Sequence, residues 1–542
     1  MQIENATIAE LRQALARRRI AAGALVRAYL ARVEAYDRAG PRLNAVRQVN
    51  PDALASAAAL DGVTPGPQRP LAGIPILVKD NIATGDGQHT TAGSLALAEA
   101  RGVRDATLVA RLRAAGAVIL GKANLTEFAN IIAIDMPAGY SSLGGQVRNP
   151  YAPAVDERGA PIVSPGGSSS GSAVAVAAGL CAAAIGTETS GSLLSPAAQN
   201  GLVTVKPTVG LISRAGILPI AHSQDTAGPL TRTVRDAAIL LNVLAAPDPR
   251  DPATLAQRRP ADYTRFLDPD ALRGARIGVP SAPSDPENDV YFGRLGLSAR
   301  AAMGEAIAAL EAHGATIVRA NIPTAGGIGG PGAEMAIPRA SPMRGPTGAR
   351  SRAPRGRNPE SATRDEPARR SIVFVYELKH DLNAYLRDWL PDAQNDGTPI
   401  RTLADIIAFN EANAERALRF GQDIFLAAEA TSGDLSELGY RAARAADLRA
   451  SRSLGLDAYL DRHRLDAVLF PGAAGAAIAA KAGYPSVQVP AGFVSGSGTP
   501  AYPFGVTFAG RAWSEPALLR IAHAFEQATR ARRPPPGLPG LQ

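Results

Sequence analysis

Two serine-rich clusters set in glycine constrain this chain more than any other feature of its sequence. The first reads SPGGSSSGS over residues 164–172, the second reads GTETSGS over residues 186–192, and an Ala/Val-rich segment joins them. Glycine admits backbone conformations that direct several N–H groups toward one point, so two such turns suit the stabilisation of an oxyanion. A flexible linker can have a similar composition, but apolar runs flank these clusters. The pattern therefore indicates nucleophilic chemistry on an acyl group, with a serine as the attacking residue.

A base for this chemistry is expected upstream of the serines. Residues 74–78 (IPILV) form an apolar, partly β-branched run that predicts a short buried strand, and Lys79 follows it directly. Burial disfavours the ammonium form, so we expect the pKa of Lys79 to fall toward neutrality. A lysine at a strand end is usually solvated, and only the combination with both serine clusters favours the catalytic interpretation.

Lys79 and the two clusters together resemble the amidase signature family. Ser168 and Ser192 lie 24 positions apart, as do the bridging and nucleophilic serines of that family. The resemblance covers most of the chain, through the motifs TTAGS (90–94), GKANLTEF (121–128), GGQVRNP (144–150), SQDTAGP (223–229) and AGYP (482–485) and the segment 505–510. Within the family, the serine-rich first cluster and the SQDTAGP motif are most similar to those of bacterial peptide amidases.

The resemblance implies an α/β fold, the amidase signature fold, with a central mixed twisted sheet covered by helices on both faces. It implies Ser192 as the nucleophile, Ser168 as the bridging serine on a cis peptide bond, and Lys79 as the base. In this scheme neutral Lys79 takes a proton from Ser168 while Ser168 takes one from Ser192, and water later cleaves the acyl-enzyme. The implied oxyanion hole consists of the backbone N–H groups of Thr189, Ser190, Gly191 and Ser192.

The second cluster departs from the family pattern at two places. Many members carry Gly at the position of Ser190, and Ser-Ile-Arg where this chain has SLL at residues 192–194. Without an arginine at Leu194 we expect a more apolar pocket there. Peptide C-terminal amides or hydrophobic acyl amides are then expected to be better substrates than free glutamine.

Three other functions stay open at this stage. The segment 167–171 (GSSSG) matches the G-x-S-x-G elbow of α/β-hydrolase esterases, with Ser169 as nucleophile, although that motif needs a strand directly before the turn and a later acid and histidine. On the family scaffold, the chain could also be an amidotransferase subunit that releases ammonia from glutamine for a partner. The third alternative, a catalytically silent binding protein, is disfavoured by the intact Lys79, Ser168 and Ser192.

Metal and cofactor motifs are scarce. The chain has no H-E-x-x-H motif, and its one cysteine, Cys181, stands in an apolar segment where a small buried hydrophobe is expected. We expect no cofactor, no metal, and neither a nucleic acid nor a membrane as partner, the substrate being a small-molecule or peptide amide. The oligomeric state stays open. The later histidines share no recognisable motif; they are His222, His313, His380, His463 and His523.

The formal charge of +8 is unevenly distributed along the chain. Nine arginines and seven prolines crowd residues 326–370, which lack hydrophobic periodicity. This composition predicts a mobile surface insertion in a single domain that spans residues 1–542. No aromatic residues are interleaved for base stacking, so a solvated loop is favoured over a nucleic-acid site. The first residues show no secretory signal and no apolar run is long enough to span a membrane, which predicts a cytoplasmic protein.

The remaining pattern alternates strands and helices, which predicts a layered α/β core. Strands are expected at residues 74–78, 117–120, 276–279, 467–470, 486–489 and 506–508. Helices are expected at 8–36 (one or two), 105–115, 234–244, 305–312, 403–418 and 516–528.

Overall fold

A mixed sheet of 11 strands runs through the protein in the order β1-β3-β2-β6-β8-β7-β16-β17-β15-β9-β10. The computed structural model describes residues 2–157, 159–281, 289–293, 295–325, 334–337, 368–496 and 498–541. The strands are β1 (Val46–Val49), β2 (Pro75–Lys79), β3 (Val118–Ala123), β6 (Ala183–Glu188), β7 (Val203–Lys206), β8 (Thr226–Thr231), β9 (Arg276–Val279), β10 (Thr316–Arg319), β15 (Ala467–Pro471), β16 (Ser486–Val494) and β17 (Tyr502–Ala509). All six expected strands are confirmed.

The strand directions decide which loops meet. Strands β3, β2 and β6 are parallel neighbours, and β15, β9 and β10 form a second parallel group. The pairs between the two groups, and the outer pair β1–β3, are antiparallel. In the β2–β6 register Val78 pairs with Ile185. The end of β2 therefore lies beside the segment that opens the second serine cluster.

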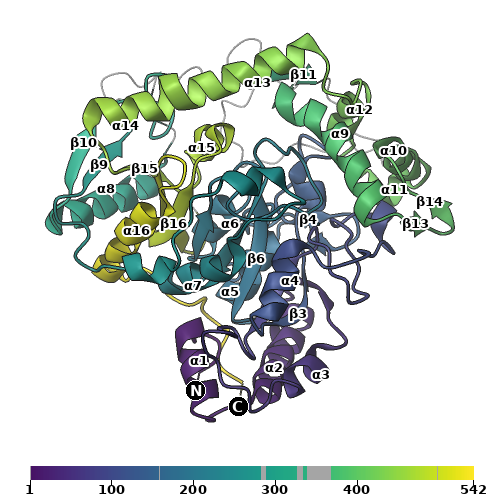
Figure 1. Ribbon diagram of the computed structural model, residues 1–542, viewed down its shortest axis with the longest axis horizontal. Coiled ribbons are helices and arrows are strands. Elements are labelled where there is room, and N and C mark those ends of the chain that lie inside the picture. The colour runs from purple at the N-terminus through teal and green to yellow at the C-terminus, as the bar shows by residue number, and fades with distance from the viewer. Residues whose placement is uncertain are drawn as a thin grey trace.

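Helices cover both faces of this sheet (Figure 1). One large cluster of buried apolar residues fills the space between the layers. Helix α1 begins with a capping box formed by Thr7 and Glu10. The helices of this part are α1 (Ile8–Ala16), α2 (Ala22–Arg32), α3 (Ala53–Ala58), α4 (Thr107–Ala114), α5 (Ser170–Ala177), α6 (Leu194–Gln199), α7 (Val234–Leu244), α8 (Leu297–Ala312), α15 (Ala476–Ala482) and α16 (Glu515–Thr529).

A second group of helices lies beside the sheet and has its own apolar cluster. It contains α9 (Ile372–Trp389), α10 (Leu403–Ala412), α11 (Ala414–Ala417) and α12 (Asp423–Glu429), which lie together on the right of Figure 1. The expected helix at 403–418 is thus divided between α10 and α11. Helices α13 (Leu438–Ser451) and α14 (Asp457–His463) follow, with α13 along the top of the same view.

Three two-stranded ribbons complete the described part: β4 (Tyr140–Ser141) with β5 (Gly145–Gln146), β11 (Glu334–Ile337) with β12 (Ala368–Ser371), and β13 (Gln394–Asn395) with β14 (Thr398–Pro399). The expected insertion at 326–370 falls mostly outside the described residues, apart from the strands β11 and β12. Within the described ranges, no helix combines the length and apolar character that a membrane crossing needs.

Candidate active site

The Ala/Val-rich segment between the serine clusters folds back on itself. Its first part is α5, in which every residue is buried, as expected for a helix that is apolar all round. Its second part is β6, which is buried along its whole length. The first cluster precedes α5 and the second follows β6, so the reversal brings the two clusters together. The backbone N–H of Ser169 donates to the carbonyl oxygen of Ser192 at 3.2 Å.

Lys79 is the last residue of β2 and is fully buried. Its Nζ lies 2.8 Å from Oγ of Ser168 and 2.9 Å from Oγ1 of Thr187. Lys122 and Lys206 are also fully buried. The Nζ of Lys122 contacts the Ile82 carbonyl and the Thr90 hydroxyl, and that of Lys206 contacts the Pro207 carbonyl. Of these three lysines, only Lys79 contacts a serine cluster.

The environment of Lys79 favours the neutral amine. Burial lowers the pKa of Lys79 to about 7, and the nearby carboxylates of Glu188 and Asp225 oppose this shift only in part. The groups in direct contact with its Nζ are two hydroxyls and the carbonyl oxygen of Thr187. The amine is therefore able to accept a proton near pH 7.

The two serines of interest differ in exposure. Ser168 is fully buried and follows a cis peptide bond at Gly167, as the sequence resemblance implies. Ser192 retains 8% of its surface exposed. The hydroxyl of Ser192 makes no hydrogen bond with any residue that the structure describes. The geometry thus joins Lys79 to Ser168 directly and leaves the Ser192 hydroxyl unengaged.

The turn after β6 presents a row of backbone N–H groups. Among the described residues, none of the N–H groups of Thr189, Ser190, Gly191 and Ser192 donates a hydrogen bond. Gly191 has a φ of 84°, a left-handed conformation that a glycine adopts without strain. Four consecutive free donors form a site suited to an anionic oxygen.

Two carboxylates hold this turn in place. One oxygen of Glu188 accepts the N–H groups of Leu193 and Leu194 at 2.7 and 3.0 Å. Asp225 accepts the Thr189 hydroxyl at 2.5 Å and also two backbone N–H groups of the preceding loop. Burial raises the pKa of Asp225 to about 6, although these hydrogen bonds favour its ionised form. The turn is fixed at both ends.

Ser169 has a structural role in this arrangement. Its hydroxyl donates to the carbonyl oxygen of Thr187 at 3.0 Å and accepts the N–H of the same residue at 3.2 Å. The residues directly before Ser169 form no strand among those described. The geometry required by the α/β-hydrolase elbow is therefore not met at Ser169.

A cavity of about 460 Å³ lies next to these groups. Asn81, Thr187, Thr189 and Asp225 line the part nearest the catalytic candidates. Its apolar wall includes Ile217, Leu218, Pro219, Ile220, Tyr385 and Trp389. The cavity thus combines a broad apolar surface with a few polar groups, the usual composition of a small-molecule site.

The expectation of an apolar pocket beside Leu194 is wrong. Leu193 and Leu194 are fully buried and do not line the cavity. Both stand at the start of α6, where their backbone N–H groups bind Glu188 and their side chains are inside the protein. The absence of an arginine at position 194 therefore does not affect the composition of this cavity.

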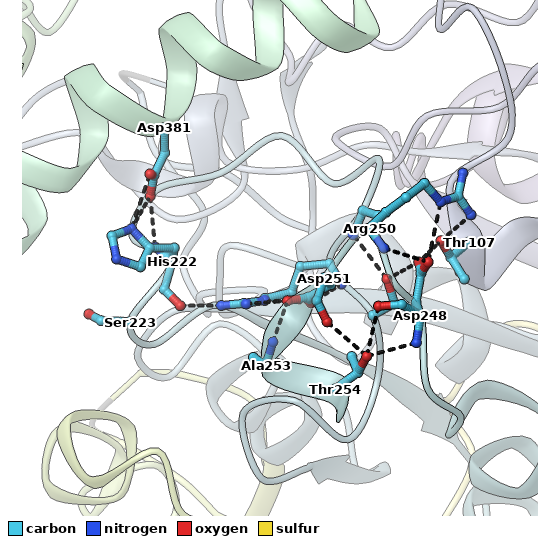
Figure 2. A network of polar contacts seen from close by, with 12 residues as sticks. Thr107, His222, Ser223, Asp248, Arg250, Asp251, Ala253, Thr254 and Asp381 are labelled. Carbon is cyan, nitrogen blue, oxygen red and sulfur yellow. Dashed lines mark hydrogen bonds and ion pairs between the residues drawn. The ribbon is translucent and has the colours of Figure 1, made fainter. Parts of the chain in front are cut away.

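Charged residues form the opposite side of the cavity. Figure 2 shows His222 and Asp381 at one end of a polar network and Arg250, Asp248 and Thr107 at the other. Arg214 pairs with Asp251 through two hydrogen bonds, at 2.8 and 2.5 Å. The charged groups that line the cavity come from the loop before β8, from the segment after α7 and from α9, whereas Thr107 of α4 and Asp248 support them from outside the lining.

Sequence reasoning missed several polar residues of the site. Thr187 and Asn81 contact one another at 3.1 Å, and Thr187 contacts Lys79. Asp225 lies within the SQDTAGP motif, so the motif pointed to its neighbourhood but not to its contact with Thr189. The pairing of His222 with Asp381 joins residues 159 positions apart, and no local pattern predicts it.

Comparison with known proteins places the chain beside amidases. A family model described as Amidase matches residues 24–326. The chain is 37% identical to a protein named probable amidase from Arabidopsis thaliana, across 98% of this chain and 92% of the relative. The native peptide amidase from Stenotrophomonas maltophilia is 41% identical, with 98% of each chain covered and a TM-score of 0.79. A glutamyl-tRNA(Gln) amidotransferase component from Salinibacter ruber is 41% identical, but only over 59% of this chain and 58% of that protein.

Proposed function

From the premise that this chain belongs to the amidase signature family and is an amide-hydrolysing enzyme, we propose that Lys79, Ser168 and Ser192 form its catalytic triad. The observation that carries the proposal is the 2.8 Å contact between Nζ of buried Lys79 and Oγ of Ser168. A lysine with a pKa near 7 acts as a base without a histidine.

The reaction begins when the substrate carbonyl meets the turn after β6. Ser192 attacks the carbonyl carbon, its proton passes to Ser168, and the Ser168 proton passes to neutral Lys79. The new C–O bond leaves an oxyanion that accepts hydrogen bonds from the free N–H groups of residues 189–192. The Ser168–Ser192 hydrogen bond forms in this step, since catalytic hydrogen bonds often tighten only with substrate bound.

The tetrahedral intermediate then collapses. The C–N bond breaks, and the proton held by Lys79 returns through Ser168 to the leaving nitrogen. The acyl group stays on Ser192 as an ester. Water attacks this ester with the same relay acting as base, which releases the carboxylic acid and restores the serine.

The substrate class that we propose is a peptide C-terminal amide. Two observations support it: the 41% identity with a peptide amidase across 98% of both chains, and a cavity with a broad apolar wall beside Thr187 and Thr189. The amidotransferase alternative rests on matches that cover about three fifths of the chain. It predicts glutamine as the preferred substrate and dependence on a partner protein.

A substrate panel separates these possibilities. The purified protein, without ATP or a partner, is assayed on an N-acetylated dipeptide amide, an aryl amide, an aryl ester and free glutamine, with Ser192→Ala as the matched inactive control. We expect the dipeptide amide to give the highest kcat/KM and Ser192→Ala to release no ammonia from it. Glutamine as the best substrate, or activity only with an added partner, would replace the proposal by the amidotransferase alternative.

A further inference from the structure

Two histidines far apart in the sequence meet an aspartate where the cavity reaches solvent. His222 lies in the loop before β8, and His380 and Asp381 are consecutive on α9. One ligand atom from each lies within 4.8 Å of the others. The two histidine side chains are 46% and 44% exposed, whereas that of Asp381 is only 10% exposed. A dissolved ion therefore has access to the imidazoles, and the carboxylate is fixed beneath them.

The Nδ1 atoms of both histidines face the same carboxylate oxygen of Asp381. Oδ1 of Asp381 lies 3.0 Å from Nδ1 of His222 and 2.8 Å from Nδ1 of His380. In a tetrahedral zinc site with bonds of about 2.0–2.2 Å, neighbouring ligand atoms lie about 3.3–3.6 Å apart. Each histidine Nδ1 needs to move about half an ångström away from Oδ1 of Asp381 to admit an ion, and rotation of the exposed imidazoles provides this movement.

The surrounding structure holds the cluster in position. The backbone N–H of His222 donates to Asp381 at 2.8 Å, and its carbonyl accepts a hydrogen bond from Arg214. One turn earlier on α9, buried Glu377 accepts the backbone N–H of Ser223 at 3.0 Å, and its Oε2 lies 3.6 Å from Nδ1 of His222. Glu377 thus places a second carboxylate near the same imidazole nitrogen of His222, and its negative charge favours a cation there.

We propose that His222, His380 and Asp381 bind one divalent transition-metal ion at the mouth of the cavity. Two imidazoles and one carboxylate suit Zn²⁺, Co²⁺ or Ni²⁺, whereas Mg²⁺ and Ca²⁺ prefer all-oxygen ligand sets. The nearby guanidinium of Arg214 is neutralised by Asp251 and does not oppose the ion strongly. Water completes the coordination.

The bound ion has a consequence for the reaction. The same cavity is lined by Asn81, Thr187 and Thr189, so an ion on its other side occupies space that a substrate needs. Zn²⁺ then raises the apparent KM and leaves kcat unchanged. This second expectation rests on the proposed function, whereas binding of the ion does not.

The direct test is a titration of the metal-free, tag-free protein with Co²⁺ and with Zn²⁺. Calorimetry and the visible absorption of Co²⁺ report binding without any assay of activity. We expect one ion per chain, with an affinity at least about 10-fold weaker in His380→Ala and in His222→Ala. His380→Ala is the decisive variant, because within the described residues the loop is held by the hydrogen bonds of the His222 backbone to Asp381 and Arg214, and the His380 side chain makes none to the loop. His313→Ala, which removes another exposed histidine, is the matched control and should bind as the parent does.

Two results would overturn the metal site. One is that neither Co²⁺ nor Zn²⁺ binds stoichiometrically at millimolar concentration. The other is unchanged affinity in His380→Ala while its thermal unfolding matches that of the parent. Inhibition by Zn²⁺ that lowers kcat at constant KM would contradict the placement of the ion in the path of the substrate.

Discussion

The Thr187→Val variant should shift the pH dependence of activity to lower pH. Lys79 has a pKa of about 7 in the folded protein and acts as a base in its neutral form. Because a pKa lowered by burial leaves the amine protonated below that value, activity is lost as the pH falls through 7. The neutral fraction is about one tenth at pH 6 and about nine tenths at pH 8, so kcat/KM should rise roughly tenfold between them.

The size of the shift follows from one hydrogen bond. The Thr187 hydroxyl oxygen lies 2.9 Å from Nζ of Lys79 and stabilises the ammonium more than the neutral amine. A hydrogen bond to a charged group contributes about 1.5–3 kcal/mol and one between neutral groups about 0.5–1.5 kcal/mol, a difference near 1 kcal/mol. Valine removes this preference for the charged form, which lowers the pKa of Lys79 by about 0.7 unit.

The assay is kcat/KM for an N-acetylated dipeptide amide from pH 5 to 9. Such a substrate has no group that titrates in this range. Thr204→Val is the matched control, because it also removes a buried strand hydroxyl, one that donates to the Pro229 carbonyl at 2.7 Å away from Lys79. If the pH at which kcat/KM reaches half its maximum stays unchanged or rises in Thr187→Val, the reasoning is refuted. It is also refuted if this midpoint lies near pH 10 in the parent protein.

Three further substitutions test other parts of the account. Lys79→Arg should lower kcat/KM by about 10²–10⁴-fold in steady-state assays, because a guanidinium stays protonated and cannot accept a proton; near-parental activity would mean that the residue supplies only charge. Asp225→Asn should lower kcat about 10-fold with little change in KM, because it weakens the support of Thr189 at the oxyanion turn; an unchanged kcat would remove that role. Arg232→Met should lower the free energy of unfolding by at least about 3 kcal/mol in urea titrations, because Arg232 donates to four buried backbone carbonyls; a loss below 1 kcal/mol would show that they find other donors.

Local patterns were enough to predict much of the sheet. The strands β2, β9, β15, β16 and β17 carry apolar or β-branched runs, and each was expected within a few residues of its observed bounds. The strands β6 and β8 were not expected. Their sequences, AAIGTE and TAGPLT, contain Ala, Gly and Pro, which have low strand propensity, and their burial comes from tertiary packing instead.

The sequence predicted the candidate catalytic residues more fully than the residues that contact and position them. The resemblance to the amidase signature family implied Lys79, Ser168 and Ser192, and the structure brings Nζ of Lys79 to Oγ of Ser168. The contact of Lys79 with Thr187 depends on the parallel pairing of β2 and β6, which spacing does not encode. The inward orientation of Leu194 depends on where α6 begins. The meeting of His222 with His380 requires the packing of α9 against a loop that precedes it by about 150 residues.

The identity of the nucleophile is the central claim, and covalent labelling tests it most directly. A fluorophosphonate reacts with an activated serine, and digestion with mass spectrometry locates the adduct. Parent, Ser192→Ala and Ser169→Ala proteins are labelled under the same conditions. We expect one adduct on Ser192 in the parent and in Ser169→Ala, and none in Ser192→Ala. An adduct that persists in Ser192→Ala and disappears in Ser169→Ala would contradict the triad and return the chemistry to Ser169.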